Sequence, residues 1–164
     1  MALRSLKIIL LLCVAMQGLF YAIQNIANLD QAFGAVAYVA SNQGHEIYPN
    51  SAFPAVTNPI LLWVALIAVL AGEFGAGFLG SKGAWDLFVN RKASADVFQK
   101  AKTFGILGCG IAVVTWFGLF MVIGGAWFQM WQTQAGGGAW SGSFIYMGSS
   151  AFVMIFLNMK DQEL

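Results

Sequence analysis

The chain has 164 residues, of which 59% are hydrophobic and only 9% are charged, and its formal net charge is +1. Soluble domains carry about 25% charged residues, so this composition excludes an ordinary water-soluble fold. The eight Lys and Arg residues are few and flank apolar segments, which argues against nucleic-acid binding. The sequence predicts an all-α polytopic membrane protein, with one domain of four transmembrane helices in a bundle.

The first predicted span covers residues 5–27 and follows two basic residues. A secretory signal peptide begins in the same way, but no clear small-residue cleavage site follows, so we expect an uncleaved helix. Gln17 and Gln24 are seven residues apart and share one helix face, with Asn25 beside it. We expect this polar face to turn inward and to form hydrogen bonds between helices.

A long outer loop is predicted over residues 28–58. It contains many aromatic and aliphatic residues, so it is too apolar to extend freely into water. We expect it to lie on the outer membrane surface, with a short interfacial helix near residues 31–40. His45, the only histidine, lies in this loop. A single histidine excludes bis-histidine haem ligation within one chain and the usual His-rich zinc site.

The second predicted span covers residues 59–81 and contains Glu73, the only acidic residue inside a predicted span. A charged side chain in the hydrocarbon costs about 2.5–3.5 kcal/mol on insertion scales, so Glu73 should face protein or water. Two interpretations stay open. Glu73 is a proton or cation site or a polar ligand contact, or else it forms an interhelical hydrogen bond to Gln17 or Thr115.

Small residues surround this carboxyl group. Gly72, Ala76 and Gly80 repeat at intervals of four residues. This small-xxx-small spacing allows a second helix to approach closely. We therefore predict that this face is a packing surface.

Residues 82–102 are predicted to form a cytoplasmic helical hairpin. No proline interrupts the second helix before a turn at residues 90–92, and Ser94 is a suitable N-cap with Asp96 in the first turn of the next helix. The tip of this hairpin is basic. It is either an orientation signal beside anionic lipid or a docking site for a partner.

The third predicted span covers residues 103–131 and the fourth covers residues 140–159. The glycine run at 136–138 predicts a short, flexible connection between them. Paired glycines near a helix end allow close approach or a kink, and tryptophan favours the membrane interface. The candidate packing or interface residues in this region are Gly124, Gly125, Trp127 and Trp131.

The basic residues predict the orientation of the four spans. They precede the first span, separate the second from the third, or follow the fourth, as Arg4, Lys7, Lys82, Arg91, Lys92, Lys100, Lys102 and Lys160. Positive charges resist translocation across the membrane. Both termini and the 82–102 hairpin are therefore expected in the cytoplasm.

The sequence contains no recognisable catalytic constellation. It has no nucleotide-binding loop and no Ser/Cys–His pair on one membrane face. Cys13 and Cys109 lie inside apolar runs and lack metal-binding spacing. We therefore predict no enzyme activity, no metal site and no cofactor, while grooves between helices leave room for bound lipid, quinone or pigment.

Residues 124–132 read Gly-Gly-Ala-Trp-Phe-Gln-Met-Trp-Gln. This segment resembles the third-span Gly-Gly-Glu-Trp-Phe-x-Met-Trp-Gln hallmark of bacterial predicted small integral membrane proteins, a four-helix domain family of unknown function. The order of spans, the intramembrane Glu73 and the Phe-Gln-Lys-Ala-Lys entry at 98–102 are also similar. Ala126 stands where the family usually has Glu, and residues 136–142 lack a common Trp-Asn-Gly pattern. The resemblance implies a four-helix fold in the bacterial inner membrane and no established activity.

Three functions are compatible with these residues. The first is a non-catalytic subunit or accessory of a larger inner-membrane complex, which packs against membrane lipids, hydrophobic cofactors, and other membrane-protein subunits or a second copy of itself. The alternative is a small homo-oligomeric transporter or channel with Glu73 on its pathway. A membrane enzyme acting on lipid or quinone would need clustered polar residues at one interface, and the sequence shows none that is convincing.

Overall fold

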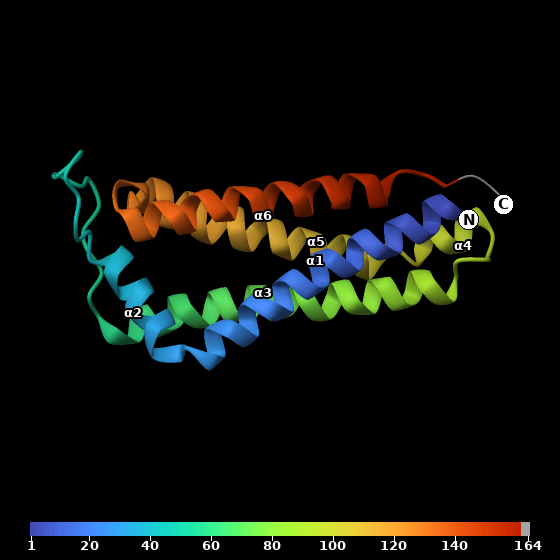
Figure 1. Ribbon diagram of the computed structural model, residues 1–164, viewed down its shortest axis with the longest axis horizontal. Helices are drawn as coiled ribbons and strands as arrows, with labels where there is room; N and C mark the ends of the chain where they lie inside the picture. The colour runs from blue at the N-terminus through green and yellow to red at the C-terminus, as the bar shows by residue number, and fades with distance from the viewer. Residues whose placement is uncertain (162–164) are drawn as a thin grey trace.

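The structure is a computed structural model that describes residues 1–161, and it consists of four long antiparallel spans (Figure 1). Each span is long and apolar enough to cross a membrane, and the described residues contain no strand, so the predicted all-α fold is confirmed. The elements are α1 (Ala2–Ala27), α2 (Leu29–Ala40), α3 (Pro59–Val89), α4 (Ala95–Lys100), α5 (Thr103–Val113), η1 (Val114–Trp127), η2 (Met130–Gln132) and α6 (Gln134–Asn158). The third span is composite, because α4, α5 and η1 follow one another along it.

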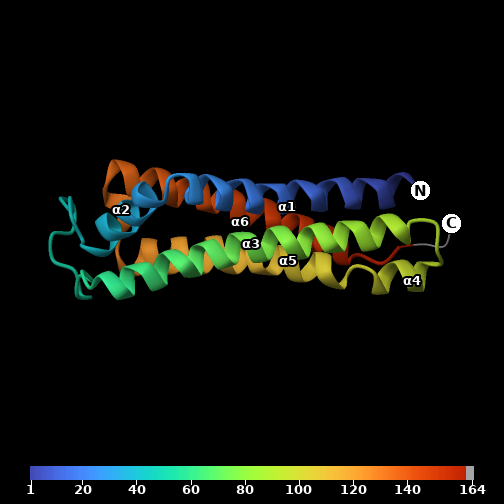
Figure 2. The same cartoon turned by 90° about the horizontal axis from the view of Figure 1, so that it is seen from below.

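The two ends of the bundle differ in composition (Figures 1 and 2). The N-terminus, the α3–α4 turn and the end of α6 lie at one end, and α2 with the loop that follows it lies at the other. We call the first the basic end, because residues 1–7, 82–102 and 158–161 carry all eight Lys and Arg residues. The second is called the loop end.

Close backbone contacts join α3 to α1 on one side and to α5 on the other. A Cβ atom on Gly18 would lie 2.7 Å from the backbone oxygen of Glu73, and one on Gly108 would lie 2.5 Å from the backbone nitrogen of Gly80. A Cβ atom on Gly83 would overlap the α5 backbone. Glycine is therefore required where these helices touch, and the close approach increases the dispersion attraction between them.

The predicted stripe of small residues on α3 packs against two neighbouring elements, η1 and α1. Gly72 faces the side chain of Thr115, and Gly80 faces Ala15 of α1. Ala76 lies between them and is fully buried in the core. The stripe is thus used for packing within the chain.

The third span ends earlier than predicted. Its last part, η1, is wound as a π-helix, and the following Phe128 N–H donates to the Ile123 carbonyl five residues back at 3.0 Å. The helix stops at Trp127 instead of Trp131, because Gln129 adopts a left-handed conformation with φ of 49°. This residue turns the chain into η2.

The prediction of a flexible connection at residues 136–138 is wrong. These glycines belong to the first turns of α6, which begins before the predicted start at residue 140. The Thr133 side chain caps the helix by accepting from the Gly136 N–H at 3.0 Å. A side chain on Gly136 would overlap the Met130 carbonyl, so glycine allows α6 to start directly against η2.

The paired glycines predicted as packing residues lie beside the turn into α6. A Cβ atom on Gly124 would lie 2.7 Å from Met130 Sδ, and one on Gly125 would lie 2.5 Å from Trp140 Nε1. They bring η1 close to both η2 and the first turns of α6.

The loop end is held together by aromatic contacts. A helix is present at the predicted position as α2, and the loop after it is tied to the end of the third span. Phe53 stacks on Trp127 with ring centroids 4.6 Å apart, and Tyr48 meets Trp131 edge-on at 5.7 Å. The Gln132 Oε1 atom accepts from two loop amides at 3.1 and 2.7 Å. Both tryptophans therefore pack on the chain's own loop.

Candidate functional site

Glu73 lies midway along α3 and points toward α1, with only 1% of the residue exposed. Asn25 Nδ2 donates to both carboxylate oxygens, at 3.1 and 2.9 Å. Gly18, two turns before Asn25, lets the α1 backbone approach close enough for this contact. The structure therefore pairs the intramembrane carboxyl group with Asn25 and with neither Gln17 nor Thr115.

The two partners suggested by the sequence lie elsewhere. Thr115 Oγ1 donates to the Ile111 carbonyl of its own helix at 2.8 Å. Gln17 is half-buried, and its Nε2 atom has no hydrogen-bond partner among the described residues. Gln24 is exposed on the surface of α1, so the predicted polar face divides into Asn25, which faces inward, and Gln24, which does not.

An aromatic cluster lies next to the carboxyl group. The hydroxyl groups of Tyr21 and Tyr146 are hydrogen-bonded, which joins α1 to α6. Trp116 is 2% exposed and meets Tyr21 and Tyr146 edge-on, with ring centroids at 6.4 and 5.6 Å. Tyr21 lies one helical turn before Asn25, the hydrogen-bond partner of Glu73. The spacing of Gln17, Tyr21 and Asn25 at intervals of four residues was the sequence signal that could have revealed this stripe.

Two buried polar atoms in this region have no hydrogen-bond partner within residues 1–161. They are Gln17 Nε2 and Ser150 Oγ. Because α1 and α6 are antiparallel and Tyr21 meets Tyr146, Gln17 and Ser150 each lie one turn from the tyrosine pair toward the basic end. Buried unpaired polar groups are rare in native proteins and are typical positions for water or a small polar ligand. The described residues contain no group of three or more His, Cys, Asp or Glu side chains that could hold a metal ion.

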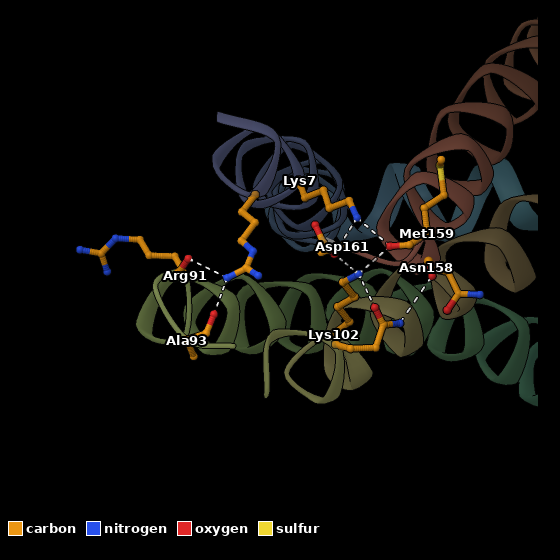
Figure 3. Close-up of polar contacts among 9 residues, drawn as sticks. Lys7, Arg91, Ala93, Lys102, Asn158, Met159 and Asp161 are labelled. Carbon is orange, nitrogen blue, oxygen red and sulfur yellow. Dashed lines mark hydrogen bonds and ion pairs between the residues drawn. The ribbon is translucent and has the colours of Figure 1, made fainter. Parts of the chain in front are cut away.

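A second polar site lies at the basic end, where three of the basic residues are buried. Arg4, Lys7 and Lys102 are at most 2% exposed. The Arg4 guanidinium donates to the carbonyls of Arg91 and Ala93 at 3.1 and 2.6 Å and so closes the α3–α4 turn (Figure 3). These three cations therefore contact protein, whereas the sequence analysis used them only as markers of orientation.

The two lysines converge on the C-terminal tail, residues 159–161 (Figure 3). Lys7 Nζ donates to Asp161 Oδ2 at 2.9 Å and to the Met159 carbonyl at 2.8 Å. Lys102 Nζ donates to the same two atoms, at 2.7 Å for the carbonyl, and to Gln99 Oε1 at 2.7 Å. The tail is thereby fastened across the ends of α1 and α5.

Asp161 is ionised in this arrangement. Burial of its side chain opposes ionisation, but the hydrogen bonds from Lys102 and Lys7 outweigh it and lower the pKa of the Asp161 carboxyl below its ordinary value. The carboxylate is the one described anion that contacts either lysine.

The geometry defines a polytopic α-helical membrane protein. Within its described residues it has a buried, hydrogen-bonded carboxyl group, Glu73, between the helices and a buried lysine pair at one end. The chain belongs to the family of predicted small integral membrane proteins (DUF2165), whose model matches residues 3–160. This match confirms the family that the sequence suggested, a predicted small integral membrane protein. Comparison with curated proteins and with solved structures gave no match.

Replacing Asn25 with alanine should destabilise the bundle, because the Glu73 carboxyl group would lose its donor while staying buried. The expected loss is about 1–3 kcal/mol. Unfolding in detergent, followed by circular dichroism, measures it. Gln24→Ala changes an exposed neighbour and should stay within about 0.5 kcal/mol of the unmodified protein. Equal losses in the two variants would contradict the assignment of Asn25 as the partner of Glu73.

Proposed function

We propose that this chain is a non-catalytic subunit or accessory of a larger assembly in the bacterial inner membrane. In this proposal both termini and the α3–α4 turn lie in the cytoplasm. The location of all eight Lys and Arg residues at one end of the bundle supports that orientation, since positive charges resist translocation. The partner is another membrane-protein subunit or a second copy of the chain.

The exposure of α6 is the observation that carries the proposal. In the most apolar segment of α6, only 17% of the residues are buried within the chain, whereas the share is 28% or more in the other three spans. Yet α6 is the least apolar of the four. A span that faces lipid over most of its surface should be the most apolar, because lipid offers no partner to polar groups. The mismatch supports a protein neighbour on the outer face of α6.

The residues on that outer face suit contact with another helix. Gly138 and Gly148 have open space where a Cβ atom would lie, and Ser141 and Ser149 are exposed beside them. Small and hydroxyl-bearing residues let helices approach closely within a membrane. The corresponding glycines of α3 are already used inside the chain, whereas those of α6 at positions 138 and 148 remain open.

A non-catalytic role is supported by the state of Glu73. The residue is 1% exposed, and both of its carboxylate oxygens accept from Asn25 Nδ2. That contact stabilises the pairing of α1 with α3, and the burial of the residue keeps the carboxyl group away from the surface of the chain. The proposal requires no metal or cofactor bound by this chain, and lipid, quinone or pigment would fill grooves that it shares with its partners.

Gly148→Leu should reduce association without affecting folding, because the position faces open space within the chain. In mild detergent we expect the unmodified protein to purify with a second membrane protein or as an oligomer. The variant should lose at least half of that association by size-exclusion chromatography coupled to light scattering and mass spectrometry. Gly118→Leu in η1, whose nearest neighbour is Val114 of the same helix at 3.9 Å, is the matched control.

The same measurement can contradict the proposal. An unmodified protein that is monomeric in mild detergent, without any co-purifying subunit, would contradict it. So would equal association of the Gly148→Leu and Gly118→Leu variants.

A second candidate function is a small homo-oligomeric transporter or channel with Glu73 on its pathway. The partnerless Gln17 Nε2 and Ser150 Oγ atoms beside the Tyr21–Tyr146 pair support it, since they could bind water between α1 and α6.

Glu73→Gln tests this candidate, because the amide keeps the shape of the side chain and removes its ionisable group. If Glu73 lies on a proton or cation pathway, flux into reconstituted vesicles should fall at least tenfold. Thr115→Val is the control, since the Thr115 hydroxyl donates to the Ile111 carbonyl within the same span. Unchanged proton, sodium and potassium flux in the Glu73→Gln variant would exclude this function.

A further inference from the structure

The lysine pair at the basic end is incompletely neutralised by its described partners. Lys7 and Lys102 both bind one oxygen, Asp161 Oδ2. Their other hydrogen-bond acceptors, the Met159 carbonyl and the Gln99 amide oxygen, are neutral. Two ammonium groups thus share a single carboxylate, although both are at least 99% buried. A buried charge without a full counter-charge is costly to the folded state.

The surroundings of the two lysines strengthen their attraction for an anion. Lys102 lies over the Phe98 ring at 5.6 Å, and Lys7 lies over the Phe156 ring at 5.5 Å. Aromatic side chains exclude water, so electrostatic interactions there are stronger than on an open surface. An ammonium group has three N–H donors, whereas Lys7 has two hydrogen-bond acceptors among the described residues. One donor of Lys7 remains for a further oxygen atom.

We propose that Lys7 and Lys102 form a binding site for a phosphate-type oxyanion, and that Asp161 is an internal occupant which such an anion replaces. A phosphate group presents two or more charged oxygens, so it can accept from both ammonium groups through separate atoms, whereas Asp161 uses one oxygen for both. The phosphodiester of an anionic lipid and free phosphate share this chemistry. The end of a transmembrane bundle lies at the depth of lipid headgroups.

The exchange requires movement of the tail alone. Asp161 is the third residue after Asn158, where α6 ends, and Met159 has an extended backbone with ψ of 136°. Rotation about the bonds of the tail would withdraw both Asp161 and the Met159 carbonyl from the lysines. Helices α1 and α5, which position the two lysines, would keep their places.

Binding measurements on the full chain in a neutral detergent test this proposal. Short-chain phosphatidylglycerol, short-chain phosphatidylcholine and inorganic phosphate are titrated separately, and the apparent Kd of each is compared. Asp161→Asn removes the internal competitor, so the Kd for phosphatidylglycerol or for phosphate should fall at least fivefold. Asp96→Asn, a change of the same type on the exposed face of α4, should leave the Kd unchanged.

The lysine variants provide the complementary measurement. The double variant Lys7→Gln, Lys102→Gln should weaken binding at least tenfold, whereas Lys100→Gln, which removes an exposed charge at the same end, should weaken it less than twofold. If Asp161→Asn lowers the Kd for phosphatidylglycerol alone, the site binds a lipid headgroup. If Asp161→Asn also lowers the Kd for inorganic phosphate, the site binds free anions. Either result supports the oxyanion site.

Two results would overturn the proposal. One is an equal Kd for the Asp161→Asn and Asp96→Asn variants with all three probes. The other is an equal loss from the Lys100→Gln variant and the lysine double variant, which would indicate general attraction to a basic surface. The aspartate comparison stands even if the lysine double variant does not fold.

Discussion

The close contact of α3 with α1 and α5 is the constraint on which the rest of the structure depends. Lipid provides no hydrophobic force between helices, so association depends on packing and on hydrogen bonds across the interface. Glycine at positions 18, 80 and 108 allows backbone atoms of neighbouring helices to touch. That contact brings Asn25 to both oxygens of Glu73, and the hydrogen bonds keep a carboxyl group inside the span without a positive charge beside it.

The same constraint determines which surfaces remain available. The small residues of α3 are covered by α1 and α5, while α6 keeps an outer face with open glycines at positions 138 and 148. Trp127 and Trp131 contact the loop that follows α2, so they are engaged within the chain. At the basic end, Lys7 and Lys102 are buried beneath a short tail. The proposed contacts with other molecules therefore lie on the outer face of α6 and at the lysine pair.

The four-span fold could be predicted from the sequence, because the length and apolarity of each segment determine it. The partner of Glu73 could not, since it depends on the register of α1 against α3, and Gln17 and Asn25 lie two turns apart along one stripe of the same helix. The burial of Lys7 and Lys102 could not be predicted from the sequence either. A lysine near the end of a span has the same neighbours in the sequence whether it is buried in protein or exposed beside the membrane. The helical conformation of residues 136–138 depends on the Thr133 cap and on contact with Met130, which is a tertiary interaction.

The stability of two glycine-to-alanine variants tests the central role of this packing most directly. In Gly108→Ala the new methyl group would lie 2.5 Å from the Gly80 backbone nitrogen, so α3 and α5 must separate, at a cost of about 1–3 kcal/mol. In Gly148→Ala the methyl group enters open space, and stability should stay within about 0.5 kcal/mol of the unmodified protein. Unfolding in detergent with increasing denaturant measures both. Equal stability of the two variants would contradict the account.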